Sequence, residues 1–213
     1  MKWRTVDKAV AYHEASHAVI AVNDGALVKY VEVTSGYDCV AGDIVCTGGN
    51  CQHYSYKGGA DRAIQTVDIA LAGFIGERLY MKPDRRRVCS GSLLSNDEWL
   101  ERCEADYMLV LNNADKCVRG GNPVGLPEEI IRRKVTQYVR GAANDLAKEL
   151  RQWWPSVTAL AEELIARCGP TGCRLLTNEV HEVLIGANNG IGRDYINRLN
   201  GWYARFLEVA AVV

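Results

Sequence analysis

Two histidines and a glutamate near the start of the chain have the spacing of a metal site. His13, Glu14 and His17 form the pattern His-Glu-x-x-His, which on a helix places both imidazoles on one face, one turn apart. Two imidazoles in that arrangement can bind one zinc ion, and a glutamate beside the first of them can act on a zinc-bound water. The spacing predicts a zinc metallopeptidase with His13 and His17 as metal ligands and Glu14 as general base.

The alternative interpretation is a helix with two histidines at its surface or at the edge of the core. Small and apolar neighbours argue against it, because they would partly bury three polar side chains that have no other role. A catalytic zinc usually has three protein ligands and one open position for water. The third ligand must then be His53, His181 or a downstream carboxylate, and Asp97 is attractive because it stands at the start of a later expected helix.

Hydropathy periods and turn residues predict the elements that position these side chains. Residues 5–23 read as a helix that stops before Gly25, and residues 27–33 and 43–47 as a small antiparallel hairpin or meander. Residues 48–60 read as a flexible glycine-rich loop. The rest is helical almost to the end, with expected helices over 61–80, 95–117, 127–154, 156–168, 178–186 and 194–211.

These elements predict a predominantly helical α+β fold of the zincin type, with a His-Glu-x-x-His helix, a small antiparallel β element and a C-terminal helical bundle. The 213 residues suit a single peptidase domain over 1–213. Residues 1–60 would hold the metal-binding helix and the sheet, and residues 61–213 the helical part that supplies the third zinc ligand.

Composition excludes several other classes. The net charge of −1 argues against a nucleic-acid partner, and no apolar run approaches the roughly 20 residues of a membrane span. The N-terminal segment does not read as a secretory signal, so we expect a cytoplasmic protein with mostly reduced cysteines. Disulfides between Cys46 and Cys51 or between Cys168 and Cys173 remain alternatives, as does a structural zinc site formed by Cys39, Cys46, Cys51 and His53.

Several segments resemble the peptidase domain of FtsH-type AAA proteases. AVAYHEASHAVIAV resembles its zinc helix, LVKYVEVTSGYDCVAGDIV its substrate-side strands, and DIALAGFIGERLY its helix rich in small residues. SGSLLSNDEWLERCEADYMLV resembles the Gly-Ala-Ser-Asn-Asp-Leu segment, whose Asp is the third zinc ligand, and VTALAEELIARC and TNEVHEVL resemble the closing helices. The resemblance covers most of residues 6–186 and implies that Asp97 completes the zinc site.

The chain departs from that family in ways that limit what carries over. Ser16 stands where the motif usually has Gly, and residues 73–77 follow the Gly-Arg-Ala-Ala-Glu-Glu core only loosely. No Gly-x-x-x-x-Gly-Lys-Ser/Thr loop occurs in the sequence, so this chain contains no ATPase module of that kind. Neither ATP-driven unfolding nor the hexamer transfers, which leaves a homo-oligomer and a separate ATPase partner open.

The expected substrate is a flexible or unfolded polypeptide. The strand that contains Tyr30, Val31, Glu32 and Val33 could bind it by adding an extended peptide to the sheet edge, although the same pattern suits an ordinary half-exposed strand. Two alternatives share this fold: a catalytically silent zinc-binding peptide adaptor, and a processing peptidase of narrow specificity. The presence of Glu14 favours an enzyme, because a structural zinc does not need it.

Overall fold

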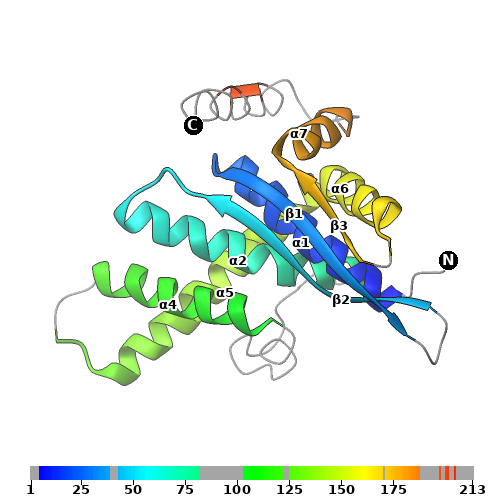
Figure 1. The fold of residues 1–213 in the computed structure, drawn as a ribbon. Coiled ribbons are helices and arrows are strands. Elements are labelled where there is room, and N and C mark those ends of the chain that lie inside the picture. The colour runs from blue at the N-terminus through cyan, green and yellow to red at the C-terminus, as the bar shows by residue number, and fades with distance from the viewer. Residues whose placement is uncertain are drawn as a thin grey trace.

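The computed structural model describes residues 5–38, 43–81, 103–121, 125–169 and 171–187, with single positions 197, 200, 201 and 204 further on. These residues form a mostly helical α+β fold with one small antiparallel sheet (Figure 1), as predicted. Asp97 and Cys39 lie outside the described residues, and so do the bulk of the expected helix over 194–211 and the start of that over 95–117.

Helix α1 (Thr5–Asn23) is the central element, packed against the sheet on one side and helices on the other. All residues from 11 to 22 are buried, and Ala15 and Ala18 let its neighbours approach closely. Its end is a Schellman motif: the N–H of Ala26 donates to the carbonyl of Ala21, and Gly25 has a φ of 76°. The predicted stop at Gly25 is confirmed.

The sheet has the strand order β2-β1-β3 and is antiparallel throughout. Strand β1 (Leu27–Asp38) pairs with β2 (Asp43–Tyr54) on one side and with β3 (Cys173–Leu176) on the other. Strand β2 therefore extends through much of the segment predicted to be a flexible loop. Its glycine-rich part pairs with β1, for example Gly49 with Val33 and Cys51 with Val31, so long-range pairing outweighs the local preference of glycine for turns.

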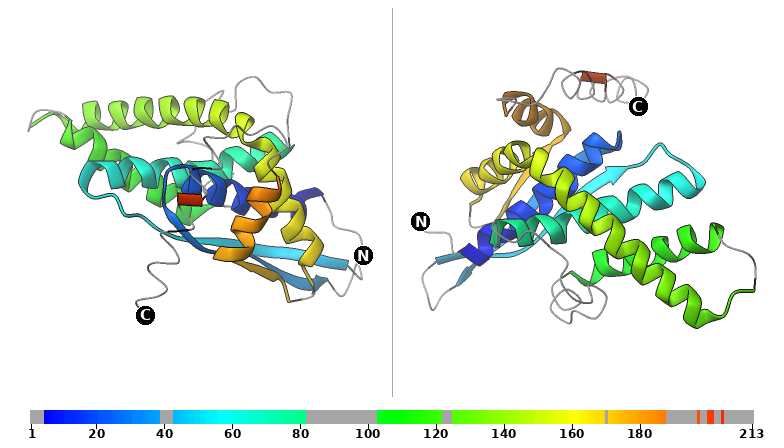
Figure 2. Two further views of the ribbon diagram at one scale, coloured as in Figure 1. Left: turned by 90° about the horizontal axis from the view of Figure 1, so that it is seen from above. Right: turned by 180° about the vertical axis from the view of Figure 1, so that it is seen from behind.

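Four further long helices pack around α1 or against one another. Helix α2 (Gly59–Met81) packs along α1, and α4 (Glu104–Gly120) packs against α2. Helix α5 (Glu128–Gln152) packs against α2 and α4, and α6 (Trp154–Arg167), with Pro155 in its first turn, packs against α1. Figure 2 shows α5 on the side of α1 and α2 opposite to the sheet.

The short helix α7 (Thr177–Gly186) directly follows β3 and packs against α6 and β1. The hydroxyl of Thr177 donates a hydrogen bond to the carbonyl of Val28 at 2.9 Å, which connects the start of α7 to the start of β1. None of the described helices combines the length and the apolar character needed to cross a membrane.

Candidate metal centre

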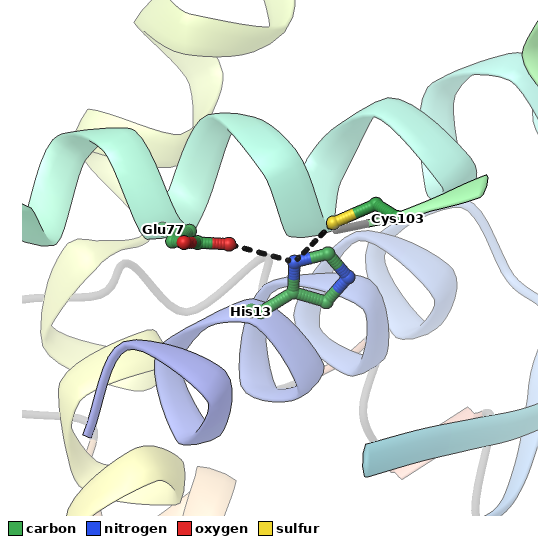
Figure 3. Close-up of side chains that lie close together, drawn as sticks. All are labelled: His13, Glu77 and Cys103. Carbon is green, nitrogen blue, oxygen red and sulfur yellow. Dashed lines mark hydrogen bonds and ion pairs between the residues drawn. The ribbon is translucent and has the colours of Figure 1, made fainter. Parts of the chain in front are cut away.

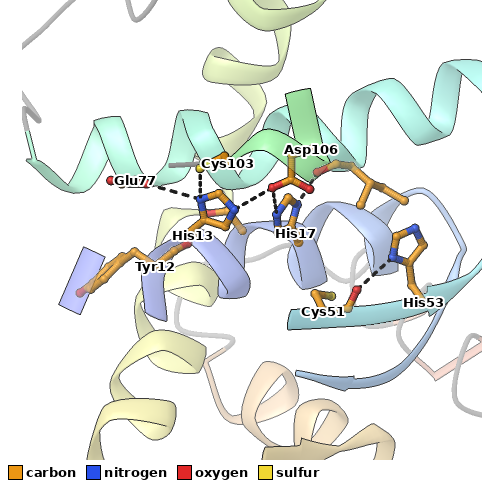
Figure 4. Close-up of polar contacts among 10 residues, drawn as sticks. Tyr12, His13, His17, Cys51, His53, Glu77, Cys103 and Asp106 are labelled. Atoms are coloured by element: carbon orange, nitrogen blue, oxygen red, sulfur yellow. Dashed lines mark hydrogen bonds and ion pairs between the residues drawn. The ribbon is translucent and has the colours of Figure 1, made fainter. Parts of the chain in front are cut away.

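Three side chains from two helices converge on one point. His13 and His17 of α1 direct their Nε2 atoms at Oδ2 of Asp106, at 3.0 and 3.2 Å (Figure 4). Ligand atoms of all three lie within 4.8 Å of one another. Two imidazole nitrogens and a carboxylate oxygen form a donor set that zinc accepts in catalytic sites.

The backbone explains why these residues meet. The i, i+4 spacing on α1 places the two imidazoles side by side, and Asp106 lies in the first turn of α4, which packs against α2. Helix α2 passes directly behind the histidines at Gly73, where a Cβ atom would lie 2.5 Å from Nε2 of His13. The close approach therefore requires glycine at this position, a role that sequence patterns did not reveal.

Contacts at the other ring nitrogens orient both imidazoles. Nδ1 of His17 lies 2.6 Å from the carbonyl oxygen of Ile69, which accepts a hydrogen bond from the protonated Nδ1, so that Nε2 is the nitrogen able to bind a metal. Nδ1 of His13 lies 3.5 Å from Oε2 of Glu77 and 3.9 Å from Sγ of Cys103 (Figure 3). Glu77 thus provides the carboxylate that commonly holds a metal-binding histidine in position.

Asp106 and the two histidines stabilise the charged forms of one another. Although burial alone would raise the pKa of the Asp106 carboxyl, the neighbouring histidines hold that pKa far below its usual range. Burial alone would lower the pKa of both histidines, but contacts with Asp106 raise it instead. The buried carboxylate is thus stabilised by positive charge on the imidazoles, and a divalent metal supplies the same charge.

Glu14 is buried next to the cluster and packs against the sheet. It is 5% exposed, and a Cβ atom on Gly49 of β2 would lie 2.6 Å from its Oε1. Burial raises the pKa of Glu14, and the nearby histidines partly offset that effect. A carboxyl group with a raised pKa is well suited to accept and release a proton near neutral pH.

A cavity of about 750 Å³ opens at the cluster. Strand β2 forms one wall, helix α2 another, and the start of α4 a third. The described residues that line it include Glu14, Gly49, Cys51, His53 and Asp106. A cavity of this size is in the range of small-molecule and peptide sites.

The candidates for the third metal ligand have different positions in the structure. Asp97 lies outside the described residues, so its predicted role stays untested. Asp106, nine positions further along the same segment, is the carboxylate found beside the histidines. His53 lines the cavity without joining the cluster, and His181 lies on α7. An acidic residue in the first turn of a helix is the only sequence signal that could have indicated Asp106.

The predicted substrate strand needs a correction. Tyr30, Val31, Glu32 and Val33 belong to β1, which is the central strand and pairs on both sides. Val31 and Val33 are also buried. The expectation that this segment offers a free sheet edge is therefore wrong, because β3, formed by a distant part of the chain, occupies that edge.

The cysteine alternatives find limited support. Cys51, Cys168 and Cys173 are free thiols, and Cys51 lies in the cavity wall with a pKa that burial raises. Among the described residues, both groups that could hold a metal include His13, and neither contains Cys51 or His53. The side chains of Cys39 and Cys46 lie outside the described part, so the predicted four-residue zinc site stays untested.

Comparison of the chain with protein-family models and with curated proteins finds no match. The resemblance to FtsH-type peptidases therefore stays an expectation from the sequence segments, and the functional argument rests on the geometry of the cluster.

Proposed function

We propose that this protein is a zinc-dependent metallopeptidase that hydrolyses peptide bonds in flexible or unfolded segments. His13, His17 and Asp106 hold the metal, and Glu14 is the general base. The observation that supports this most strongly is the convergence of the three donors, at 3.0 and 3.2 Å, beside a buried glutamate at an open cavity. Buried polar groups of this kind destabilise a fold unless they are paired or bind a ligand.

The donor set fits zinc in number, type and exposure to the cavity. When bound, zinc would polarise the carbonyl of the cleaved bond and make water more acidic. Glu14 accepts the proton of the attacking water and passes it to the leaving amine. Glu77 and the carbonyl of Ile69 keep the two imidazole rings in the orientation that a metal needs.

Strand β2 is the element best placed to bind the substrate backbone. It lies at an edge of the sheet, and no strand within the described residues pairs with its outer side. Gly48, Gly49, Asn50 and Cys51 of β2 line the cavity opposite the histidines. An extended peptide can add to this edge through backbone hydrogen bonds.

Replacement of the base tests the reaction directly. Glu14→Gln keeps the size of the side chain and removes its basicity, so we expect normal zinc content and a loss of peptide hydrolysis of about 100-fold or more. The readout is cleavage of a disordered protein, with zinc measured on the same sample. Near-normal turnover would show that Glu14 is not the base, and loss of zinc would give it a metal-binding or structural role.

The kind of substrate follows from the absence of a nucleotide loop in the chain. Unfolding a stable domain requires about 5–15 kcal/mol, and the chain shows no means of coupling ATP hydrolysis to that work. We therefore expect cleavage of a disordered protein, survival of a stable folded protein of similar length, and no effect of ATP. Equal cleavage of both proteins without ATP would contradict this substrate class, whereas zinc binding without any cleavage would favour the peptide adaptor.

A further inference from the structure

The active-site cavity has opposite charges at its two ends. Its acidic side chains are Glu14, Glu77, Glu104 and Asp106. Asp106 belongs to the cluster with His13 and His17, and Glu77 contacts His13. Apart from the histidines, the one basic residue among the described residues that line the cavity is Arg62. Arg62 is exposed on α2, and its guanidinium makes no ion pair within the described part of the chain.

Arg62 lies at a fixed distance from the metal cluster because both are placed by α2. Gly73 of that helix touches the two histidines, and Arg62 precedes it by 11 residues, or about 16 Å of helix. Along the opposite wall, β2 runs from Gly49, beside Glu14, to His53, a span of four residues or about 13 Å. An extended peptide on β2 therefore covers about four residues between the cluster and the Arg62 end.

The connection between β2 and α2 joins His53 to Arg62, which both line the cavity. Gln65, 1% exposed, holds this corner: its amide donates to the carbonyl of Asp24 at 2.8 Å, and the hydroxyl of Ser55 donates to its side-chain oxygen. Lys57, in the same connection, faces the carboxyl groups of Asp24 and Asp68. Arg62 is thus the basic group in this corner that remains for a ligand.

We propose that Arg62 forms a carboxylate-binding subsite, so that the peptidase prefers segments with an acidic group about four residues from the cleaved bond. The inference rests on the proposed function. A guanidinium binds carboxylates in a geometry that a neutral side chain cannot replace, and the acidic opposite end disfavours the reverse placement of such a substrate. The carboxylate can come from a Glu or Asp side chain or from the C-terminus of the peptide.

Peptides that differ only in the position of one Glu or Gln test the subsite. We expect the Glu peptide to be cleaved faster than its Gln counterpart at one position about four residues from the cleaved bond. At that position, Arg62→Ala lowers kcat/KM for the Glu peptide about two- to fivefold through KM and leaves the Gln peptide unchanged. Arg62→Lys retains part of the preference, and Arg62→Glu reverses it in favour of Lys.

Two controls separate the possible outcomes. Arg132→Ala, an equal charge change on the exposed face of α5, should leave the preference intact. Peptides with a free or an amidated C-terminus distinguish the terminal carboxylate from a side chain. Cleavage of Glu and Gln peptides at equal rates in every position, or an unchanged preference in Arg62→Ala, would overturn the subsite alone. Failure of the wild-type protein to cleave any peptide would instead overturn the proposed function.

Discussion

The imidazole of His13 has different partners at its two nitrogens. Nε2 faces Asp106 at 3.0 Å, and Nδ1 faces Glu77 at 3.5 Å. Since a metal binds a neutral imidazole through one nitrogen, the other nitrogen carries the proton and needs an acceptor. Glu77, 8% exposed, lies on the neighbouring helix α2, where its carboxylate can be that acceptor.

Removal of this acceptor should weaken metal binding without removing a ligand. We expect Glu77→Ala to lower zinc affinity about 10- to 100-fold and Glu77→Gln to lower it less, because Gln retains an accepting oxygen. Competition with a chelator measures the affinity. Glu104→Ala is the matched control, since Glu104 lines the same cavity but is exposed. Unchanged affinity in Glu77→Ala would show that Glu77 does not orient His13.

The close packing at Gly73 leads to a second prediction for a single residue. A methyl group at this position would overlap His13 and His17 at their metal-binding nitrogens, so we expect Gly73→Ala to lose most of its zinc. Gly141→Ala on α5 is the control, because nothing lies within 4 Å of the added Cβ and removal of a helical glycine stabilises by about 0.5–1 kcal/mol. Zinc content and thermal unfolding of both variants check this. Full zinc occupancy in Gly73→Ala would contradict the observed packing.

Helices α1 and α2 lie close together at Ser16 and Gly76. The hydroxyl of Ser16 donates to the carbonyl of Tyr12 at 2.7 Å, and a Cβ atom on Gly76 would overlap the Ser16 side chain, with 2.6 Å to its Cβ. Ser16 stands where the resembled family usually has Gly, and Gly76 falls in the loosely matched segment. Ser16 and Gly76 therefore share one space, which sets how closely α1 approaches α2 at this point.

This compensation predicts a strong coupling between the two positions. We expect Gly76→Ala alone to destabilise the fold by about 1–3 kcal/mol through overpacking. The double variant Ser16→Gly with Gly76→Ala should recover most of that loss, giving a coupling free energy above about 1 kcal/mol. Urea unfolding of the four proteins in the cycle measures it. Additive effects would show that Ser16 and Gly76 do not share one space.

How much the sequence could predict differs between the elements. The bounds of α1 and the pair His13 and His17 follow from local periodicity and a glycine stop, and both could be predicted. The role of residues 30–33 could not, because whether β1 has a free edge depends on β3, about 140 residues away. The carboxylate beside the histidines likewise depends on where α4 lies against α2, which no local pattern reports.

At the scale of the whole molecule, acidic groups at the end of α1 and on α2 and α5 lie close to one another. Asp24 follows α1, Asp68 lies on α2, and Glu149 lies on α5, where it accepts a hydrogen bond from Asn23. Burial first, and then the charges of Asp24 and Glu149, raise the pKa of Asp68 to about 7, while Lys57 acts in the opposite direction. We therefore expect the stability of this junction to depend on pH.

The raised pKa of Asp68 predicts that the folded protein becomes less stable as the pH rises. A carboxyl group with a raised pKa in the folded protein binds its proton more tightly there than in the unfolded chain, so its contribution to stability falls as pH rises from about 4 to about 7. We expect Asp68→Asn to have the same melting temperature as the wild type near pH 4 and a higher one at pH 8. Calorimetry at four pH values, with Asp145→Asn on the exposed face of α5 as control, measures it. A difference independent of pH would contradict the raised pKa.

The measurement that tests the central claim most directly is the zinc content of purified Asp106→Ala beside the wild type. Asp145→Ala serves as a control, because Asp145 is exposed and its ion-pair partner among the described residues is Lys148. The geometry predicts about one zinc per chain in the wild type and in Asp145→Ala, and a clear loss in Asp106→Ala together with peptide hydrolysis. Undiminished zinc in a folded Asp106→Ala protein would contradict the assigned ligand set, and a parallel Asp97→Ala protein that loses its zinc would assign the third position to Asp97 instead.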